Sequence, residues 1–567
     1  MKKLSIIFLL STLLYSCNDL DLAPLAEGSV ETWYSTEEEI LMSIYDLNKD
    51  AFFPLGLNID GPDGWTDDWM YRETMSPITS GTITGEWGIA NTNYWLNSYK
   101  AITRCNTLII NLGRAADKIA ATTLLQYEAE VRFIRACQYS RLISLFGDVV
   151  YYTDPLTIDE AFTMGRVSKS EVLKSIYEDF DFAAANAPLE YTGSAIKKST
   201  KGTALGMKAR IALFEGDFET AKNAAKACMD LGVYKLHDDF SSLFLSEAKY
   251  SKEFIFAQPR SVELKITVGI QDFIPRNAGG WAAWAPTWDL FCAFLCTDGL
   301  PIDESPLFDP REPFKNRDPR CAATIVEFNT PFLGFMYEPH PDSLTVMNFS
   351  TGRKQTNNDT RANAQFASFT GLLWKKWVED SWLQNSWQAA PTKMILRYAD
   401  VLLMYAEAKV KLGEIDQSVL DAINSVRARA YGVDKSEVNN YPPVTTTDSK
   451  TLMRIIMTER RMEFAYEGIR YMDIIRWRLA EKVLNRPVYG MLDPAALREN
   501  VVNKGLWFFP EVPEIDEDGI ADFTSMYQKG LIKLITQRQF DKNRQYLWPI
   551  PSKDIIINDN IKQNPGY

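Results

Sequence analysis

Residues 201–232 read KGTALGMKARIALFEGDFETAKNAAKACMDLG, and this stretch decides the fold. Apolar and small residues recur at helical spacing on both sides of Gly216-Asp217, which predicts two amphipathic helices joined by a tight turn. The face along which the helices would meet carries only small side chains: Ala209, Ala212, Ala221, Ala225 and Cys228. Because the distance between packed helices depends on the side chains at the contact, we expect this pair to approach closely.

A second stretch repeats this plan later in the chain. Residues 396–430, LRYADVLLMYAEAKVKLGEIDQSVLDAINSVRARA, turn at Gly413-Glu414 and carry Ala406 in the place of Ala209. Two such units predict a mainly α fold, a tetratricopeptide-like scaffold of helical pairs, with ordinary helical hairpins as the alternative. Because the two units lie far apart in the sequence, a large insert must interrupt the array.

Helical periodicity and its stop signals predict the remaining helices. A helix that ends near Leu47 should start behind the capping box Ser35-Thr36-Glu37-Glu38. Five more helices are expected at residues 94–112, 122–146, 168–186, 451–466 and 468–480. Residues 50–90 are rich in Gly, Pro, Asp and Trp and are expected to form a long loop, which in a compact domain is more often functional than idle.

Residues 236–392 differ from the helical segments. They lack a long helical period, are rich in Pro, Gly, Asp and Asn, and carry many Trp residues. We expect a loop-rich insert with a few short strands, such as 253–257 and 323–328. One domain at 35–567 would then comprise a helical scaffold at about 35–235 and 393–485, this insert, and an extended C-terminal segment at 486–567.

The start of the chain, MKKLSIIFLLSTLLYSC, has the features of a lipoprotein signal. Two lysines precede an apolar run that is too short to span a bilayer, and Leu14-Tyr15-Ser16-Cys17 resembles a lipobox. We therefore expect a signal peptide at 1–16, lipidation of Cys17 and a lipidated tether at 17–34, with an ordinary secretory signal as the alternative. The acidic residues after Cys17 resemble a surface-export signal of Bacteroidota, which predicts the outer face of the outer membrane.

Composition excludes several classes of function. The net charge is −13, and no Lys/Arg-rich stripe is present, so nucleic acid is not an expected partner. His237 and His340 are the only histidines, and neither lies in a motif for a metal site or a catalytic triad. We predict no metal site and no cofactor. The six cysteines beyond Cys17 are expected to be buried free thiols: Cys105, Cys137, Cys228, Cys292, Cys296 and Cys321.

The stretch 459–468, ERRMEFAYEG, invites a catalytic interpretation. Glu459, Glu463 and Glu467 fall on one helix face, and paired carboxylates can hydrolyse glycosides when they flank a sugar. Successive carboxylates on one helix point along that helix and do not enclose a substrate. A network of Arg and Glu side chains that locks helices together is the favoured alternative.

Several stretches together resemble one family of proteins. Thr458–Trp477, Leu396–Ala408 and the ending LWPIP (547–551) with NPGY (564–567) are similar to the SusD/RagB-type outer-membrane lipoproteins. TDGLP (297–301), NRDPR (316–320) and the segment Trp95–Thr103 with Asn106 fit the same family. These matches span the mature chain in the order that the family has.

The resemblance implies a helical tetratricopeptide scaffold with a loop-rich ligand face. It also implies a non-enzymatic protein that binds glycans at the cell surface and caps a SusC-like TonB-dependent transporter as a hinged lid. Peptide-binding relatives share this fold, so a peptide receptor is one alternative, and a surface glycoside hydrolase is another.

Two loops carry Trp outside any helical periodicity, at 60–93 and 277–288. Flat aromatic rings stack on the C–H faces of sugars, and polar side chains pair with the hydroxyls. In relatives the ligand contacts come from the stretch before the helix that resembles Trp95–Thr103 and from loops of the insert. The predicted glycan-binding residues are Trp65, Asp67, Asp68, Arg72, Trp87, Asn91, Trp281 and Trp284. In contrast, Trp95 and Trp548 are expected in the core.

Overall fold

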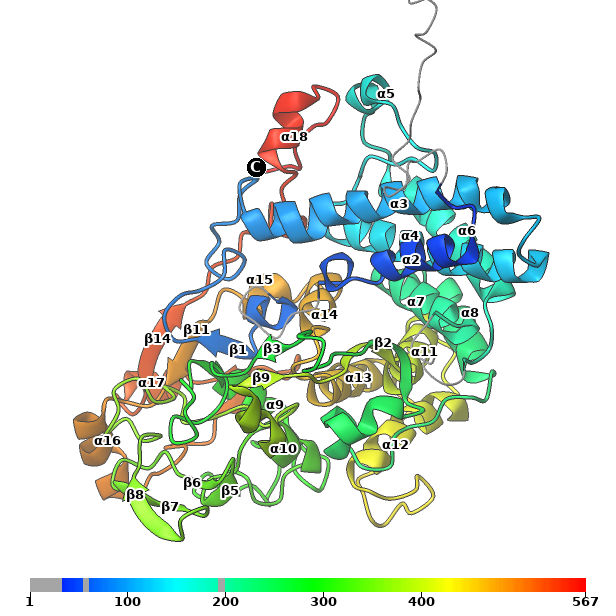
Figure 1. Ribbon diagram of the computed structural model, residues 1–567. Helices are drawn as coiled ribbons and strands as arrows, with labels where there is room; N and C mark the ends of the chain where they lie inside the picture. Colours follow the sequence, from blue (N-terminus) through cyan, green and yellow to red (C-terminus); the bar gives the residue numbers. More distant parts are fainter. Residues whose placement is uncertain (1–32, 55–60, 192–198) are drawn as a thin grey trace, which may run out of the picture.

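The computed structural model describes residues 33–54, 61–191 and 199–567. The predicted signal peptide, Cys17 and all of the predicted tether except Trp33 and Tyr34 lie outside these residues. The fold is mainly helical, as predicted, with short strands, of which all but β1 (Trp69–Tyr71) follow residue 253 (Figure 1). Among the helices that the structure describes, none combines the length and apolarity needed to cross a bilayer.

Eleven of the described helices make up most of the scaffold. They are α2 (Glu37–Leu47), α3 (Asn97–Asn111), α4 (Ala121–Phe146), α6 (Lys169–Asn186), α7 (Lys201–Phe214), α8 (Phe218–Met229), α11 (Tyr398–Leu412), α12 (Gln417–Ala430), α13 (Ser449–Glu463), α14 (Arg470–Arg476) and α15 (Ala480–Val483). The predicted pair at 201–232 is α7–α8, and the predicted pair at 396–430 is α11–α12. Helix α11 packs on α8, so the two pairs are neighbours in space.

Local signals explain where the helices begin and end. Thr36 caps α2, and its side chain and that of Glu39 form the reciprocal capping box, so the box begins one residue later than predicted. Gly147 ends α4 with a φ of 75°, which a residue with a side chain rarely adopts. The helix predicted at 468–480 is interrupted, because Arg478 takes a positive φ between α14 and α15.

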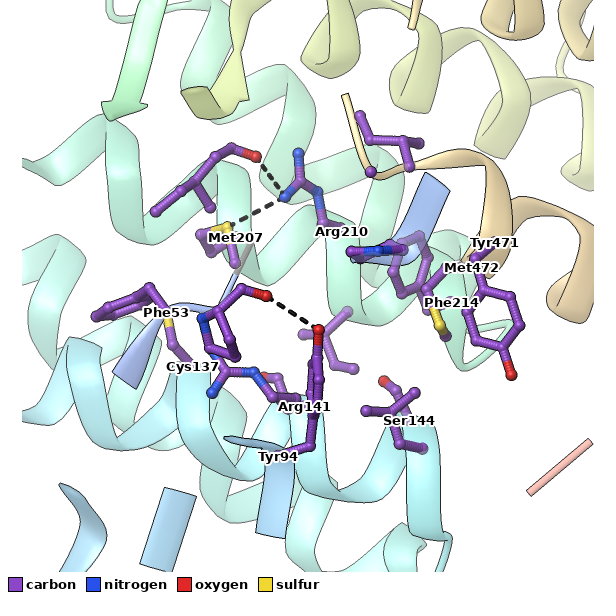
Figure 2. A pocket seen from close by; sticks show the side chains of 18 of the residues that line it. Phe53, Tyr94, Cys137, Arg141, Ser144, Met207, Arg210, Phe214, Tyr471 and Met472 are labelled. Carbon is purple, nitrogen blue, oxygen red and sulfur yellow. Dashed lines mark hydrogen bonds between the residues drawn. The ribbon is translucent and has the colours of Figure 1, made fainter. Parts of the chain in front are cut away.

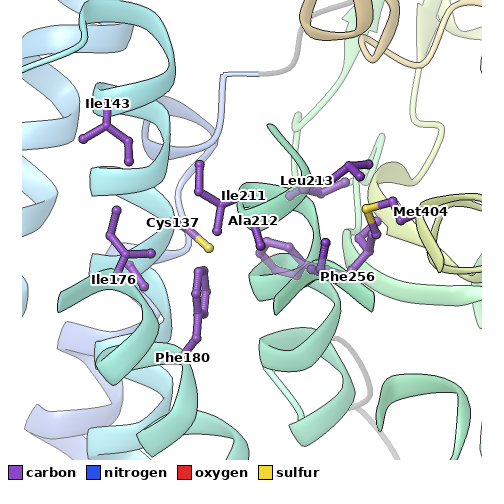
Figure 3. Packing of buried hydrophobic residues seen from close by; sticks show 14 of the residues in the cluster. Cys137, Ile143, Ile176, Phe180, Ile211, Ala212, Leu213, Phe256 and Met404 are labelled. Atoms are coloured by element: carbon purple, nitrogen blue, oxygen red, sulfur yellow. The ribbon is translucent and has the colours of Figure 1, made fainter. Parts of the chain in front are cut away.

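The scaffold core is closed by the small residues that the sequence singled out. Ala209, Ala212 and Ala406 are completely buried, as are the partners contributed by α8. Figure 3 shows Cys137 of α4, Phe180 of α6 and Ile211 of α7 converging on one interior. All six described cysteines are buried and free, as predicted.

The insert forms a second hydrophobic core, rich in Trp and Phe. Its elements are short: β2 (Phe254–Gln258), β3 (Val268–Gly269), β4 (Trp284–Pro286), α9 (Trp288–Ala293), α10 (Pro319–Thr324), the sheet of β5 (Thr330–Phe332), β6 (Phe335–Tyr337), β7 (Thr345–Asn348) and β8 (Arg353–Thr356), and β9 (Gln388–Ala389). The strand predicted at 253–257 is confirmed as β2. The strand predicted at 323–328 is wrong, because α10 ends inside it and only Ile325 forms a bridge, to Trp374.

Strand β2 pairs with β10 (Lys393–Arg397), which leads directly into α11, so the insert and the scaffold meet there. The C-terminal segment contains more regular structure than expected: β11 (Pro487–Gly490), α16 (Pro494–Asn500), β12 (Glu514–Ile515), β13 (Ala521–Asp522), α17 (Thr524–Gln528), β14 (Lys533–Gln537) and α18 (Ser552–Ile557). It returns to the scaffold, where Trp548, like Trp95, is buried in the first core. Both Trp residues were predicted there.

Helix α13 joins the two cores. Leu452 and Ile456 belong to the scaffold core, whereas Met462 belongs to the core of the insert. The charged residues of this helix form a buried ion-pair network. Arg397 contacts Glu253, Glu463 and Glu467 at 2.6–2.7 Å.

The carboxylates of ERRMEFAYEG serve this network and do not reach solvent. Arg320 also binds Glu459 and Glu463, whose side chains are fully buried. Burial raises the pKa of Glu463, but the guanidinium groups of Arg429, Arg397 and Arg320 together hold it well below its usual range. The structural interpretation of the motif is therefore confirmed for these glutamates.

Candidate functional site

The structure brings the two Trp-bearing loops together as one small sheet. Strand β1 (Trp69–Tyr71), in the first loop, pairs antiparallel with β4 in the second, with Tyr71 opposite Trp284. Hydrogen bonds extend the pairing at both ends: Arg72 N donates to the Ala283 carbonyl, and Thr287 N donates to the Asp68 carbonyl. The two loops thus form one continuous part of the molecule.

The first loop, residues 60–93, is held in place by ion pairs with helices α13 and α14. Arg461 contacts Asp67 at 2.9 Å and Asp68 at 2.6 Å, and Arg470 contacts Asp67 at 2.9 Å. Burial raises the pKa of Asp67, but Arg461 and Arg470 hold it far below its usual range. Both aspartates are buried, so the prediction that they bind ligand hydroxyls is corrected: they anchor the loop.

Nearby, Asp63 is another buried carboxylate of this loop. It accepts the backbone N–H of Gly468, the last residue of the ERRMEFAYEG motif, at 3.1 Å. Burial raises its pKa to about 7, and the Gly468 bond only partly opposes that effect. The loop is therefore tied to the scaffold at Asp63, Asp67 and Asp68.

Trp65 and Trp87 form part of the core. Trp65 is 1% exposed, and its ring meets those of Tyr471 at 5.3 Å and Trp548 at 5.0 Å. Trp87 is half-buried against Trp65 and Trp548. The stacking role predicted for Trp65 is corrected, because its ring is buried in the scaffold core and does not face the surface of the loop, and most of Trp87 is covered by its neighbours.

Trp284 and Asn91 also have structural partners. Trp284 is buried, with Trp69 on one side at 4.6 Å and Tyr71 on the other at 4.6 Å. Its predicted stacking role is corrected in the same way. Asn91 is half-buried in the π-helix Ala90–Leu96 and donates from Nδ2 to the Gly85 carbonyl at 2.8 Å. Its side chain therefore closes a local turn.

Trp281 is the predicted Trp that faces solvent, with 47% of its surface exposed. The turn before it needs glycine, since a Cβ on Gly280 would lie 2.3 Å from the Ile274 carbonyl oxygen. Its backbone is fixed by three hydrogen bonds: Trp281 N donates to the Gln271 carbonyl, and the Trp281 carbonyl accepts from Arg72 and Arg276. A rigid backbone carries an exposed aromatic side chain.

Arg72 holds three segments at this point. Its Nη1 donates to the carbonyls of Trp281 at 2.5 Å and Phe366 at 2.9 Å, and its guanidinium lies over the Phe366 ring at 5.2 Å. The Phe366 side chain is 46% exposed, so a second aromatic residue stands beside Trp281. Arg72 was predicted to bind ligand hydroxyls. In the structure its guanidinium instead positions Trp281 and Phe366 through their backbone carbonyls.

The second loop has its own buried carboxylate. Asp359 accepts the backbone N–H groups of Arg276 at 2.6 Å and Asn277 at 3.3 Å, and burial raises its pKa to about 6. Phe366 and Asp359 were not identified as site residues from the sequence. No local pattern distinguishes either from other loop residues, since each is assigned by contacts made across the fold.

The exposed part of this face can bind but shows no constellation for catalysis or metal binding. In the described parts of the chain, no group of three or more His, Cys, Asp or Glu side chains could hold a metal ion. Glu73 and Arg276 border the aromatic pair with charged groups that can pair with ligand hydroxyls. We call Arg72, Glu73, Arg276, Trp281 and Phe366 the aromatic face.

Comparisons with known proteins agree with this architecture. The family model described as "SusD family" matches residues 252–567, and the model "Starch-binding associating with outer membrane" matches residues 62–213. SusD-like protein P25 of Formosa agariphila is 22% identical over 85% of this chain and 90% of its own length.

Solved structures show the same fold. A SusD-like carbohydrate binding protein from Bacteroides fragilis NCTC 9343 superposes with a TM-score of 0.77 at 27% identity, covering 93% of this chain and 99% of the other. A laminarin binding SusD-like protein gives a TM-score of 0.62 at 18% identity, covering 94% and 98%. The family model spans more than half of the sequence, and the chain therefore belongs to the SusD family of non-catalytic binding proteins.

Proposed function

We propose that this protein is a glycan-binding lipoprotein of the outer cell surface. It is anchored in the outer membrane through lipidated Cys17 and binds oligo- or polysaccharide on the aromatic face. It passes the glycan to a SusC-like TonB-dependent transporter, over which it closes as a lid. The lipobox supports the anchor, and the family supports the transporter as partner.

The observation that carries this proposal is the exposed Trp281 on a backbone fixed by Arg72. A sugar ring presents C–H groups that pack against a flat aromatic ring, and a Trp on a fixed backbone has only its side-chain rotation to lose on binding. Phe366 offers a second apolar surface beside it. The name of the Bacteroides fragilis structure, a carbohydrate binding protein, favours the same class of ligand.

The test is calorimetric titration of residues 18–567 with a panel of oligosaccharides, including laminarin fragments. The change Trp281→Ala should weaken binding at least tenfold, as expected for a central aromatic contact. The matched control is Phe162→Ala on α5 (Ile158–Thr163), because Phe162 is 48% exposed and α5 lies far from β1 (Figure 1). This control should bind like the wild type.

Three results would count against the proposal. Release of sugar products would indicate a hydrolase. Binding of peptides and of no glycan would favour the peptide receptor, with the same role at the transporter. Equal loss of affinity in Trp281→Ala and Phe162→Ala would move the binding site away from the aromatic face.

The anchor has a separate test. Cells that produce the wild-type chain should incorporate labelled fatty acid into it, and the Cys17→Ala variant should not be labelled. Protease added to whole cells should degrade the wild-type protein if it lies on the outer face. Resistance to protease would place the protein on the periplasmic side of the outer membrane.

A further inference from the structure

A cavity of about 170 Å³ lies inside the scaffold, away from the aromatic face. Its walls come from α4, α7 and the start of α14, together with Phe53, Trp65 and Tyr94 (Figure 2). Most of the described lining side chains are aromatic or aliphatic. A polar sugar would leave its hydroxyls without partners on such walls, so the cavity suits a different ligand.

Arg141 is the unusual polar residue of this lining. Its Nη1 donates to Gln138 Oε1 at 2.9 Å and Ser98 Oγ at 3.4 Å, and its Nη2 donates to the Phe52 carbonyl at 2.9 Å. These acceptors are all neutral. Among the residues that the structure describes, no carboxylate forms an ion pair with Arg141, and burial lowers its pKa to about 10.

Arg210, on another wall of the same cavity, shows the usual arrangement. Its guanidinium pairs with Asp400 at 2.6 Å, and it also donates to the Ile395 carbonyl (Figure 2). A buried cation is normally paired in this way, because desolvation of an isolated charge is costly. The contrast marks Arg141 as the cation that could accept an anionic ligand.

Ser140 supplies a second, independent sign of a ligand. It lines the cavity, is 7% exposed, and its Oγ is buried without a hydrogen-bond partner among the described residues. Buried hydroxyl groups almost always have a partner. An unpaired hydroxyl next to an arginine without a carboxylate indicates that the missing acceptor belongs to a bound molecule.

We propose that this cavity binds a small carboxylic acid with one aromatic ring or a short alkyl chain. An engineered apolar cavity of about 150 Å³ takes up benzene, so this volume holds about one ring. The carboxylate would meet Arg141 and the Ser140 hydroxyl, and the ring would lie against the apolar walls. The site is distinct from the aromatic face and gives the protein a second ligand class.

The probe is 4-fluorobenzoate, observed by ¹⁹F NMR with residues 18–567, and 4-fluorotoluene serves as a neutral probe of the same ring. Wild-type protein should shift the signal of 4-fluorobenzoate saturably. Arg141→Met should weaken that binding at least tenfold and leave 4-fluorotoluene unchanged. Ser140→Leu should fill the cavity and weaken the binding of both probes.

Arg353→Met, on exposed β8, is the matched control for loss of an arginine and should bind like the wild type. Circular dichroism would confirm that the variants are folded. Trp281→Ala should also leave 4-fluorobenzoate binding unchanged, because the two sites are separate.

Three outcomes would overturn the proposal. One is the absence of any shift with either probe. Another is equal affinity of the wild type and Arg141→Met for 4-fluorobenzoate. The third is an equal loss of 4-fluorobenzoate affinity in Arg141→Met and Arg353→Met, which would show that the effect does not come from the cavity.

Discussion

The loops 60–93 and 277–288 are similar in composition, but the exposure of their Trp side chains differs. Both are rich in Gly, carry several Trp residues and stand outside helical periodicity. In the first loop Trp65 is buried and Trp87 half-buried, whereas in the second Trp281 projects into solvent. The strands β1 and β4 pair the two loops, so the difference arises within a single small sheet.

The difference lies in what each loop meets from the rest of the chain. The first loop presents carboxylate side chains to Arg461 and Arg470 of the scaffold, and these ion pairs pull it inward. The second is held mainly through its backbone, by Asp359 and Arg72. The backbone hydrogen bonds of the second loop leave the Trp281 side chain exposed, although Trp284 of the same loop is buried.

Removing the charge that holds the first loop should have the largest effect. Arg461→Met leaves Asp67 and Asp68 buried with less compensation, so we expect the free energy of unfolding to fall by about 3–5 kcal/mol. Urea denaturation measures this change. Arg498→Met is the control, because Arg498 and Asp342 form an exposed pair worth less than about 1 kcal/mol. A similar decrease in the free energy of unfolding in Arg461→Met and Arg498→Met would contradict the proposal that the ion pairs of Arg461 hold the first loop in the interior.

The next test compares the buried Trp65 of the first loop with the exposed Trp281 of the second. Trp65→Ala should lower the free energy of unfolding by about 3–5 kcal/mol, because it removes a buried aromatic side chain from the core. Trp281→Ala should change it by less than about 0.5 kcal/mol, because the ring is exposed. Thermal unfolding and glycan titration of both variants would show stability lost in one and affinity lost in the other. Equal destabilisation would remove the distinction between the loops.

Asp63 gives the first loop a pH dependence. Its pKa is raised to about 7 in the folded state, so the folded protein binds this proton more tightly than the unfolded chain does. This contribution to stability is complete at acidic pH and is lost as the pH rises from about 4 to 7. At about 1.4 kcal/mol per pKa unit the loss is at most about 4 kcal/mol.

Asp63→Asn keeps an acceptor for Gly468 N and removes the titration. The stability of this variant relative to wild type should therefore increase between pH 4 and pH 7, as followed by the melting temperature. Other carboxylates titrate in both proteins, so the comparison cancels them. A difference that stays constant with pH would show that Asp63 keeps an ordinary pKa.

The smallest effect is expected at the clamp of the second loop. Arg72→Lys keeps the charge but cannot reproduce the paired contacts of the guanidinium with Trp281 and Phe366. We expect glycan affinity to fall about three- to tenfold, corresponding to about one hydrogen bond, with little change in stability. Arg353→Lys is the control. Unchanged affinity in Arg72→Lys would show that the aromatic face does not depend on this clamp.

The sequence predicted the scaffold well because its signals are local. The helix pairs follow from small residues at helical spacing, and Gly147 and Gly413 end helices where they were expected to. The Glu residues of ERRMEFAYEG were also interpreted correctly as members of an ion-pair network, although α13 ends at Glu463 and Glu467 therefore lies beyond the helix. Each of these arguments needs only a short window of sequence.

The candidate site could not be predicted to the same extent. Asp68 is paired with Arg461, 393 residues away, and Phe366 reaches the face through Arg72, 294 residues away. A single sequence does not show which distant partners will meet. Trp65, Asp67, Asp68 and Trp284 looked available because composition distinguishes a loop from a helix but does not distinguish a buried loop from an exposed one.

Helix α13 has a mechanical consequence. Because it contributes side chains to both cores, this helix ties the insert to the scaffold. Loop 60–93 is connected to α13 and α14 through the ion pairs of Arg461 and Arg470 with its aspartates. Loop 277–288 is connected to loop 60–93 through the pairing of β1 with β4. We therefore expect the insert and the scaffold to move together as one rigid body.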